Sequence, residues 1–170
     1  METLPAVSVR RFRADEWQAY RQLRLRALAD APDAFGSTLE VEGAKPDEYW
    51  ADRLSFAAHS PAQLLLMAEL GAERVGLALG VIGPAEPELA QVFQMWVAPP
   101  ARGRGCATVL LDTLLAWARD ANAKSVALRV TCGDTPARRL YERAGFTSHG
   151  DPEPLRPDST ARVQAMTLTF

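Results

Sequence analysis

The 170-residue sequence has few of the residue types that build disulfide scaffolds and metal sites. It contains two cysteines, Cys106 and Cys132, and two histidines, His59 and His149. Neither cysteine belongs to a Cys-x-x-Cys or Cys/His cluster, which argues against a disulfide framework and a zinc site, and no metal is expected. Both histidines are isolated in the sequence, which favours surface positions over a catalytic role.

Strong net charge and long apolar segments are also lacking. Nineteen Lys and Arg against 21 Asp and Glu leave a formal net charge of -2, which argues against a nucleic acid or an anionic membrane as partner. The longest apolar run, around residues 75–83, is far shorter than the ~20 residues of a membrane helix. The N-terminus has Glu2 and no basic segment before an apolar one, so we expect no signal peptide and a cytoplasmic protein.

The length suits one domain over residues 1–170, and the sequence contains no internal repeat, low-complexity tract or linker. Runs of strand-forming residues between turns, with alternation in residues 125–131, predict strands over residues 8–13, 63–70, 73–82, 89–97, 125–131 and 162–170, with a hairpin at Gly71-Ala72. Helical spacing predicts a helix capped by Asp15, and further helices over residues 46–54, over 105–121 and from Pro136 to a stop at Gly145. Residues 151–159 contain three prolines and are predicted to form a loop.

Basic residues gather near the N-terminus, on the first predicted strand and helix. Because the other faces of these two elements are apolar, the simplest interpretation is a solvated face rather than a patch for an anionic partner. The arginines concerned are Arg10, Arg11, Arg13, Arg21, Arg24 and Arg26.

The most informative segment is Val97-Ala98-Pro99-Pro100-Ala101-Arg102-Gly103-Arg104-Gly105-Cys106-Ala107, in which a strand leads through an Arg/Gly turn into a helix. Gly103 and Gly105 permit strained backbone angles and close approach of a ligand. The first N–H groups of the helix have no intrahelical partner, and the helix dipole favours an anion there. Arg102 and Arg104 add mobile positive charge. The segment therefore predicts a cradle for a pyrophosphate.

Two common phosphate loops are excluded by spacing. There is no Gly-Lys-Ser/Thr for a P-loop, and no G-x-G-x-x-G, because the third glycine is missing after Gly105. What remains, Arg102-x-x-Gly105-x-Ala107, resembles the acetyl-CoA signature Q/R-x-x-G-x-G/A of the GCN5-related N-acetyltransferase (GNAT) superfamily.

A second motif lies downstream, after a predicted helix and strand. Asp134-Thr135-Pro136-Ala137-Arg138-Arg139-Leu140-Tyr141-Glu142-Arg143-Ala144-Gly145-Phe146 resembles the later motif of the same superfamily, N-x-x-A-x-x-x-Y-x-x-x-G-F. Two motifs in the expected order and on the expected elements make a chance match implausible.

The resemblance implies an α+β fold, an acyl-CoA N-acyltransferase sandwich. Its sheet is mixed and mostly antiparallel, with the fourth and fifth strands splayed apart. Acetyl-CoA would lie along the fourth strand, where the backbone of Met95 and Val97 pairs with the pantetheine arm and the Met95 N–H serves as oxyanion donor. The implied cofactor-binding residues are Met95, Trp96, Val97, Arg102, Gly103, Arg104, Gly105, Cys106, Ala107, Thr108, Asp134, Ala137 and Tyr141.

Tyr141 matches the residue that in this superfamily commonly protonates the departing CoA thiolate. A phenol with a pKa of about 10 can share a proton with a thiolate of about 8.5 at little cost. The alternative is a core tyrosine on an apolar helix face. Asp134 stands where the superfamily usually has Asn, and an ionised carboxylate cannot donate to a CoA carbonyl. The alternative is that Asp134, with Thr135, caps the helix.

The general base is not fixed by the sequence. The superfamily's histone-modifying members use a glutamate on the fourth strand, where this chain has Gln91, which cannot accept a proton at neutral pH. The segment from Phe35 to Glu42 is expected to form the acceptor pocket, with Glu40 as base and Glu42 as its alternative. Glu69 is a third candidate for the base. The alternative for Glu40 and Glu42 is that they are solvated loop carboxylates without a catalytic role.

The sequence thus predicts an enzyme, an acetyl-CoA-dependent N-acetyltransferase that acts on a primary amine of a small molecule or peptide by direct attack in a ternary complex. Cys106 lies at a helix N-terminus, which would lower its pKa, but direct transfer leaves it no covalent role. The alternative function is a CoA-binding sensor or interaction module with little turnover. The oligomeric state is not indicated by the sequence, and a homodimer is one of the assemblies considered.

Overall fold

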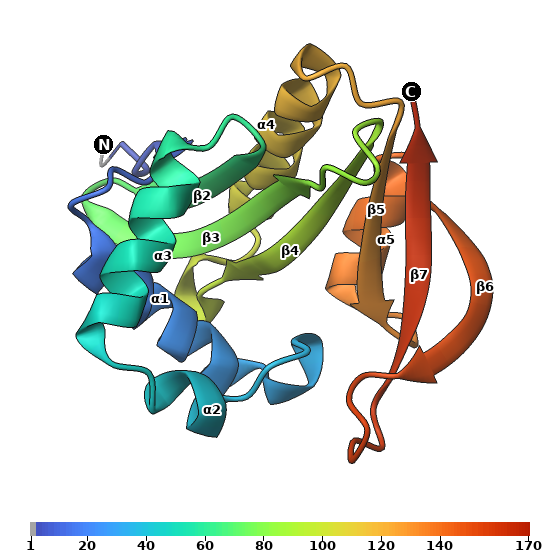
Figure 1. The fold of residues 1–170 in the computed structure, drawn as a ribbon, viewed down its shortest axis with the longest axis horizontal. Helices are drawn as coiled ribbons and strands as arrows, with labels where there is room; N and C mark the ends of the chain where they lie inside the picture. The colour runs from blue at the N-terminus through green and yellow to red at the C-terminus, as the bar shows by residue number, and fades with distance from the viewer. Residues whose placement is uncertain (1–2) are drawn as a thin grey trace.

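The computed structural model describes residues 3–170 and contains a seven-stranded sheet of order β1-β2-β3-β4-β5-β7-β6 (Figure 1). Met1 and Glu2, on which the signal-peptide prediction partly rests, lie outside the described residues. The strands are β1 (Val7–Arg11), β2 (Gln63–Leu70), β3 (Glu73–Ile82), β4 (Leu89–Val97), β5 (Ser125–Thr131), β6 (Thr147–Pro154) and β7 (Arg162–Thr169).

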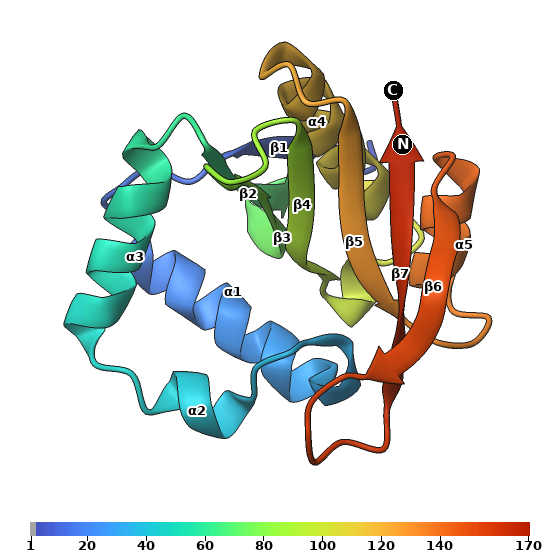
Figure 2. The ribbon, with the colours of Figure 1, turned by 45° about the vertical axis from the view of Figure 1, so that its right-hand side comes forward.

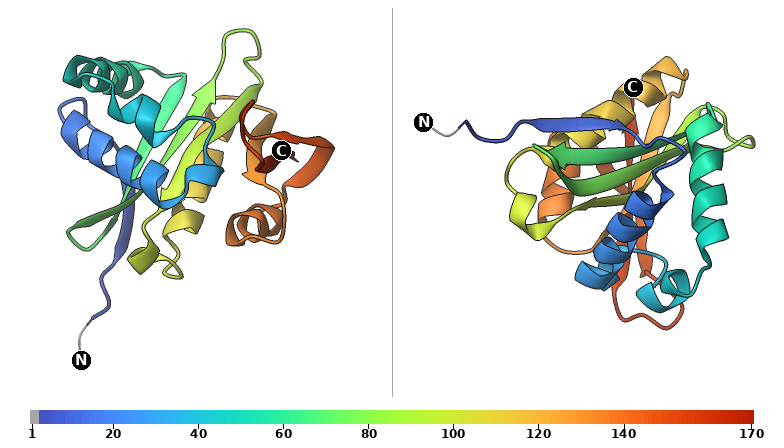
Figure 3. Two further views of the ribbon diagram at one scale, coloured as in Figure 1. Left: turned by 90° about the horizontal axis from the view of Figure 1, so that it is seen from below. Right: turned by 90° about the vertical axis from the view of Figure 1, so that its left-hand side faces the viewer.

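Helices cover both faces of the sheet (Figure 3), with α1 and α3 on one face and α4 on the other. The helices are α1 (Trp17–Asp30), α2 (Leu39–Gly43), α3 (Asp47–His59), α4 (Cys106–Asp120) and α5 (Pro136–Arg143), with short 3-10 turns at Pro32–Ala34 and Pro99–Ala101. Among the described residues, no helix combines the length and the apolar character needed to span a membrane.

The sheet divides into two parts that meet at β4 and β5. Strands β1 to β4 pair antiparallel, as do β5, β7 and β6, whereas β4 and β5 run parallel and pair over Leu89–Gln91 and Ser125–Ala127. Beyond these residues the two strands diverge (Figure 2). The mixed, mostly antiparallel sheet with splayed fourth and fifth strands is therefore confirmed.

The hydrophobic core fills the space between the helices and the sheet. Helix α4 turns Leu110, Leu111 and Leu114 inward, and burial of each such side chain stabilises the fold by about 1.5–3 kcal/mol. The helix approaches β3 closely at Gly80, where a Cβ atom would lie 2.7 Å from the ring of Trp117. Glycine at this position therefore sets the distance between α4 and the sheet.

Predicted and observed elements differ mainly near the chain's irregular segments. The predicted bounds of β2, β3, β4 and β5 agree with the structure, but β1 ends at Arg11 and α3 continues to His59. Helix α2 was not predicted. The predicted loop over residues 151–159 is wrong for its first part, because residues 151–154 belong to β6 and pair with β7.

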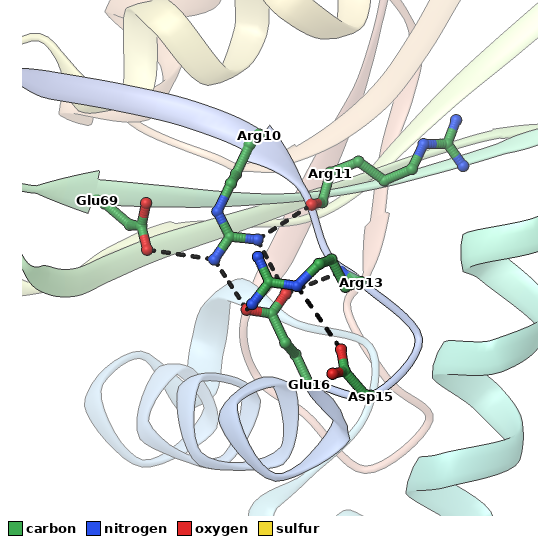
Figure 4. A network of polar contacts seen from close by, with 6 residues as sticks. All are labelled: Arg10, Arg11, Arg13, Asp15, Glu16 and Glu69. Atoms are coloured by element: carbon green, nitrogen blue, oxygen red, sulfur yellow. Dashed lines mark hydrogen bonds and ion pairs between the residues drawn. The ribbon is translucent and has the colours of Figure 1, made fainter.

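Glu16, rather than Asp15, organises the start of α1 (Figure 4). Its carboxylate accepts two hydrogen bonds from Arg10, at 2.8 and 2.9 Å, and one from the backbone N–H of Arg13 at 2.8 Å. Arg10 also reaches Glu69 on β2, at 3.3 Å. Asp15 is exposed and lies 3.7 Å from Arg13, so the predicted Asp15 cap is wrong. The network ties β1, β2 and α1 together.

The interpretation of the N-terminal arginines as a solvated face holds for Arg13 and Arg26, which are exposed, but not for the others. Arg11 is half-buried and donates to the carbonyl of Ala57 at the end of α3. Arg24 is buried against Glu42. The apolar patterns that predicted α1 and β1 say nothing about these long-range partners.

The Glu16 network should make stability depend on pH. Its hydrogen bonds with Arg10 lower the pKa of Glu16 from 4.5 to about 2. The carboxylate therefore stabilises the fold above pH 4.5, and this contribution is lost as the pH falls toward 2. We expect Glu16→Gln to lower the free energy of unfolding by about 2 kcal/mol at pH 7 and by much less near pH 2.5, measured by urea denaturation.

Asp15→Asn is the matched control, since Asp15 is exposed, and its effect should stay within about 0.5 kcal/mol at both pH values. An equal loss for Glu16→Gln at pH 7 and pH 2.5 would contradict the assignment of this pH dependence to Glu16.

Candidate active site

A cavity of about 740 Å³ opens where β4 and β5 diverge. Its walls include Met95 on β4, Tyr141 on α5 and residues 35–37 of the connection between α1 and α2. The splayed strands thus bring together a strand edge, a tyrosine and a loop that are distant in the sequence. Of the predicted acceptor segment, Phe35, Gly36 and Ser37 line the cavity.

Strand β4 carries a β-bulge at the cavity. Two of its residues, Gln94 and Met95, stand opposite Ala78 of β3, and Gln94 has a φ of 57°. The Gln94 side chain accepts a hydrogen bond of 3.0 Å from the hydroxyl of Tyr20 on α1. A bulge re-aims the backbone of a strand. Tyr20 therefore supports an irregular backbone conformation next to Met95, which periodicity alone could not indicate.

The predicted cradle lies at the start of α4. Gly103 and Gly105 have φ values of 76° and 86°, and a Cβ atom at either position would meet open space. Within residues 3–170, the backbone N–H groups of residues 103–108 have no acceptor. Such a set of free donors at a helix N-terminus is an anion-binding arrangement.

The Arg102 side chain is fixed, which corrects the prediction of two mobile arginines. Its Nε donates to the carbonyl of Val97 at 2.9 Å, and its Nη2 lies 2.6 Å from Asp30 at the end of α1. Asp30 also accepts from the indole of Trp96, and this hydrogen bond is the largest cause of its lowered pKa. The Trp96 side chain is buried. Only Arg104 of the two arginines is left without an ion pair in the described residues.

Cys106 does not fit the expectation of an activated thiol. Its side chain is buried, and burial raises the pKa of the thiol, which is opposite to the predicted direction. The helix N-terminus does not outweigh this loss of solvation. Ala107 is half-buried, and Thr108 is exposed at the cradle.

Helix α5 presents the second motif. Its N-cap is Thr135, whose hydroxyl accepts from the backbone N–H of Arg138, whereas Asp134 pairs with Arg139 at 2.8 Å. Ala137 is exposed. Tyr141 is 5% exposed and lines the cavity, and burial raises the pKa of its phenol above the usual range. The phenol is therefore protonated at neutral pH.

The three predicted base candidates lie in three different settings. Glu40 is exposed on α2 and lies outside the cavity lining, which includes Gln91 instead. Glu42 is buried and engaged by Arg24, and Glu69 pairs with Arg10 outside the lining. The cavity lining contains no carboxylate among the described residues. A base role for Glu40 or Glu42 therefore finds no support in this geometry.

Sequence reasoning missed that three arginines and a histidine line the cavity, namely Arg24, Arg53, Arg129 and His149. They come from α1, α3, β5 and β6, so no local motif connects them. His149 is exposed, as expected, but it lies at the cavity. In the part of the chain that the structure describes, no group of three or more His, Cys, Asp or Glu is placed to hold a metal ion.

Comparisons with known proteins identify a family. The model of the acetyltransferase (GNAT) family matches residues 15–146. Proteins named mycothiol acetyltransferase from Thermomonospora curvata and Geodermatophilus obscurus are 34% identical over 131 residues and 32% identical over 149 residues. The alignments cover 77% and 84% of this chain but 40% and 45% of those proteins. The chain thus spans less than half the length of these curated relatives.

Solved structures share the fold. An acetyltransferase of the GNAT family from Streptococcus pneumoniae superposes with a TM-score of 0.80 at 17% identity, over 97% of this chain and all of that one. Spermidine N-acetyltransferase from Vibrio cholerae, solved with CoA and spermine, gives 0.76 at 18% identity, over 96% of this chain and 95% of that one. Similarity at this level of identity shows the fold alone.

Proposed function

We propose an acetyl-transfer function for this chain, which belongs to the acetyltransferase (GNAT) family. In the proposed reaction an acetyl group passes from acetyl-CoA to a primary amine of a small molecule or peptide, by direct attack in a ternary complex. One observation carries the proposal: Met95 and Tyr141 line the same cavity at the opening between β4 and β5.

The residues around α4 suit the pyrophosphate of acetyl-CoA. The free N–H groups of residues 103–108 would bind it, and Gly103 and Gly105 leave room for its approach. Arg104 would add charge, whereas Arg102 would act indirectly, by fixing the end of β4 through Val97. Met95 and the neighbouring edge of β4 would accommodate the pantetheine arm.

Tyr141 is proposed to protonate the leaving thiolate. When bound, acetyl-CoA supplies a thioester; the attacking nitrogen forms a C–N bond as the C–S bond breaks. The nitrogen must lose one proton and the thiolate must gain one. Burial keeps the Tyr141 phenol protonated but also makes it a weaker acid, so it would donate a hydrogen bond to the developing thiolate and pass its proton only as the proton released by the amine reaches it through water. The Met95 N–H would stabilise the developing oxyanion.

The relatives support acetyl transfer but leave the amine open. The name mycothiol acetyltransferase belongs to proteins more than twice as long as the region matched here. The CoA-bound and spermine-bound neighbour shares only the fold with this chain. A small molecule and a peptide end therefore both remain within the proposal.

The alternative is a CoA-binding sensor of the same fold with little turnover. It is favoured by Asp134, which pairs with Arg139 and cannot donate as an asparagine would. Thiol release from acetyl-CoA, measured with a panel of amines and without any amine, separates the two functions. If the chain is an enzyme, thiol release should depend on the amine. Tight acetyl-CoA binding without amine-dependent thiol release would establish the sensor.

A further inference from the structure

The lining of the cavity carries uncompensated positive charge. Arg53 of α3 lines it and donates to the amide oxygen of Gln63 at 3.1 Å, but it forms no ion pair with any described residue. Arg129 of β5, which also lines the cavity, pairs with Glu153 at 3.5 Å. Since no carboxylate lines the cavity among residues 3–170, Arg53 leaves one positive charge without a partner.

A second guanidinium in this region is buried and incompletely bonded. Arg24 is 4% exposed, and its Nε and Nη2 donate to the two oxygens of Glu42 at 3.0 and 2.7 Å. The remaining nitrogen, Nη1, is buried and has no acceptor in the described chain, although Arg24 lines the cavity. A buried donor without an acceptor is costly. A ligand group that accepts from Nη1 would remove this cost.

Arg24 and Arg53 line the same cavity. The positive charge of both opposes the rise in the pKa of the Tyr20 phenol that burial causes, whereas the Glu42 carboxylate adds to that rise. That hydroxyl donates to Gln94 in the β4 bulge, next to Met95. The ring of Phe35, which also lines the cavity, lies under the Arg24 guanidinium, 4.8 Å from its central carbon.

We infer that the acceptor is a small amine that carries a carboxylate, and that Arg24 Nη1 and Arg53 bind this carboxylate. The inference deepens the proposed function and rests on it. Guanidinium groups bind carboxylates through short, charge-assisted hydrogen bonds. Because Glu42 already neutralises Arg24, the site offers one net positive charge, which matches one carboxylate better than a doubly charged phosphate.

The same charges assist the amine. The attacking nitrogen must be neutral, and nearby positive charge disfavours an ammonium. The ammonium of a free amino acid is held above the pKa of a peptide N-terminus, about 7.7–8.0, by its own carboxylate, and pairing of that carboxylate with Arg53 would lower the pKa of the amine. A cavity without a carboxylate base therefore suits an α-amine, whereas a polyamine, which has several ammonium groups, would be repelled.

The test compares amino acids with their carboxamides, which keep the α-amine and lose the charge, and includes spermidine. We expect kcat/KM for the best amino acid to exceed that for its carboxamide by at least tenfold, with spermidine poorer than both. In Arg53→Gln the amino acid should lose at least tenfold through KM, while the carboxamide changes little. Arg24→Lys, which keeps the charge beside Glu42 and removes Nη1, should act in the same direction.

Arg74→Gln is the control, because Arg74 is exposed on β3 and lies outside the cavity lining. Calorimetric binding of the same compounds in the presence of CoA separates this inference from the proposed function, since it needs no turnover. Turnover with equal preference for acid and carboxamide, unchanged in Arg53→Gln, would overturn the inference alone. Carboxylate binding that depends on Arg53 but is not accompanied by turnover would overturn the proposed function alone. The absence of both binding and turnover would overturn the inference and the proposed function together.

Discussion

Replacing Tyr141 by phenylalanine is expected to lower kcat roughly 10²-fold while acetyl-CoA affinity stays within a few-fold. The substitution keeps the ring, which packs beside Phe146 at a centroid distance of 5.8 Å, and removes only the hydroxyl. Since burial keeps the phenol protonated, the wild-type rate should show no loss from Tyr141 titration up to about pH 10. Steady-state kinetics with a saturating amine, together with calorimetry of acetyl-CoA, measure both quantities.

Tyr49→Phe provides the control, because Tyr49 is partly exposed on α3 and does not line the cavity. Its kcat should match that of the wild type. Full activity in Tyr141→Phe would mean that Tyr141 is a packing residue and that another group protonates the thiolate.

Gly105→Val is expected to weaken acetyl-CoA binding about tenfold to hundredfold, or about 1.4–2.8 kcal/mol. Gly105 has a φ of 86°, which a β-branched residue adopts only with strain. Its missing Cβ leaves open the space that the free N–H groups of residues 103–108 face. Valine would therefore both disturb the start of α4 and fill the proposed pyrophosphate site. Calorimetric titration with acetyl-CoA measures the change.

Two further variants separate blocked binding from poor folding. Gly83→Val places the same side chain in an open turn where no positive φ is required, and binding should not change. Gly105→Asn introduces a residue that tolerates the left-handed conformation, so thermal unfolding of this variant should resemble that of the wild type. Its affinity for acetyl-CoA should still fall. Unchanged affinity in a folded Gly105→Val protein would remove the cradle from the proposed site.

The strands and the cradle could be predicted because their causes are local. Apolar runs in β2 and β3, alternation in β5 and flanking turns give these strands their bounds, and Gly105 marks the start of α4 through its backbone freedom. The splayed strands and the cosubstrate were predicted through the family resemblance, not through periodicity. The family match over residues 15–146 supports both.

What could not be predicted depends on long-range pairing. All residues of β6 are exposed, and it contains prolines and a glycine, so no apolar alternation indicates a strand; pairing with β7 defines it. The pairs Arg24 with Glu42 and Arg102 with Asp30 join residues far apart in the chain. Each pair changes the role assigned to a residue. Glu42 is the ion-pair partner of Arg24 instead of a base, and Arg102 fixes the end of β4.

The most direct test is a crystal structure of the protein with CoA bound. We predict that the pyrophosphate accepts hydrogen bonds from the backbone N–H groups of residues 103–108, and that the thiol enters the cavity between β4 and β5 within hydrogen-bonding reach of the Tyr141 hydroxyl. CoA bound with its pyrophosphate away from the start of α4, or with its thiol outside this cavity, would contradict the proposed site.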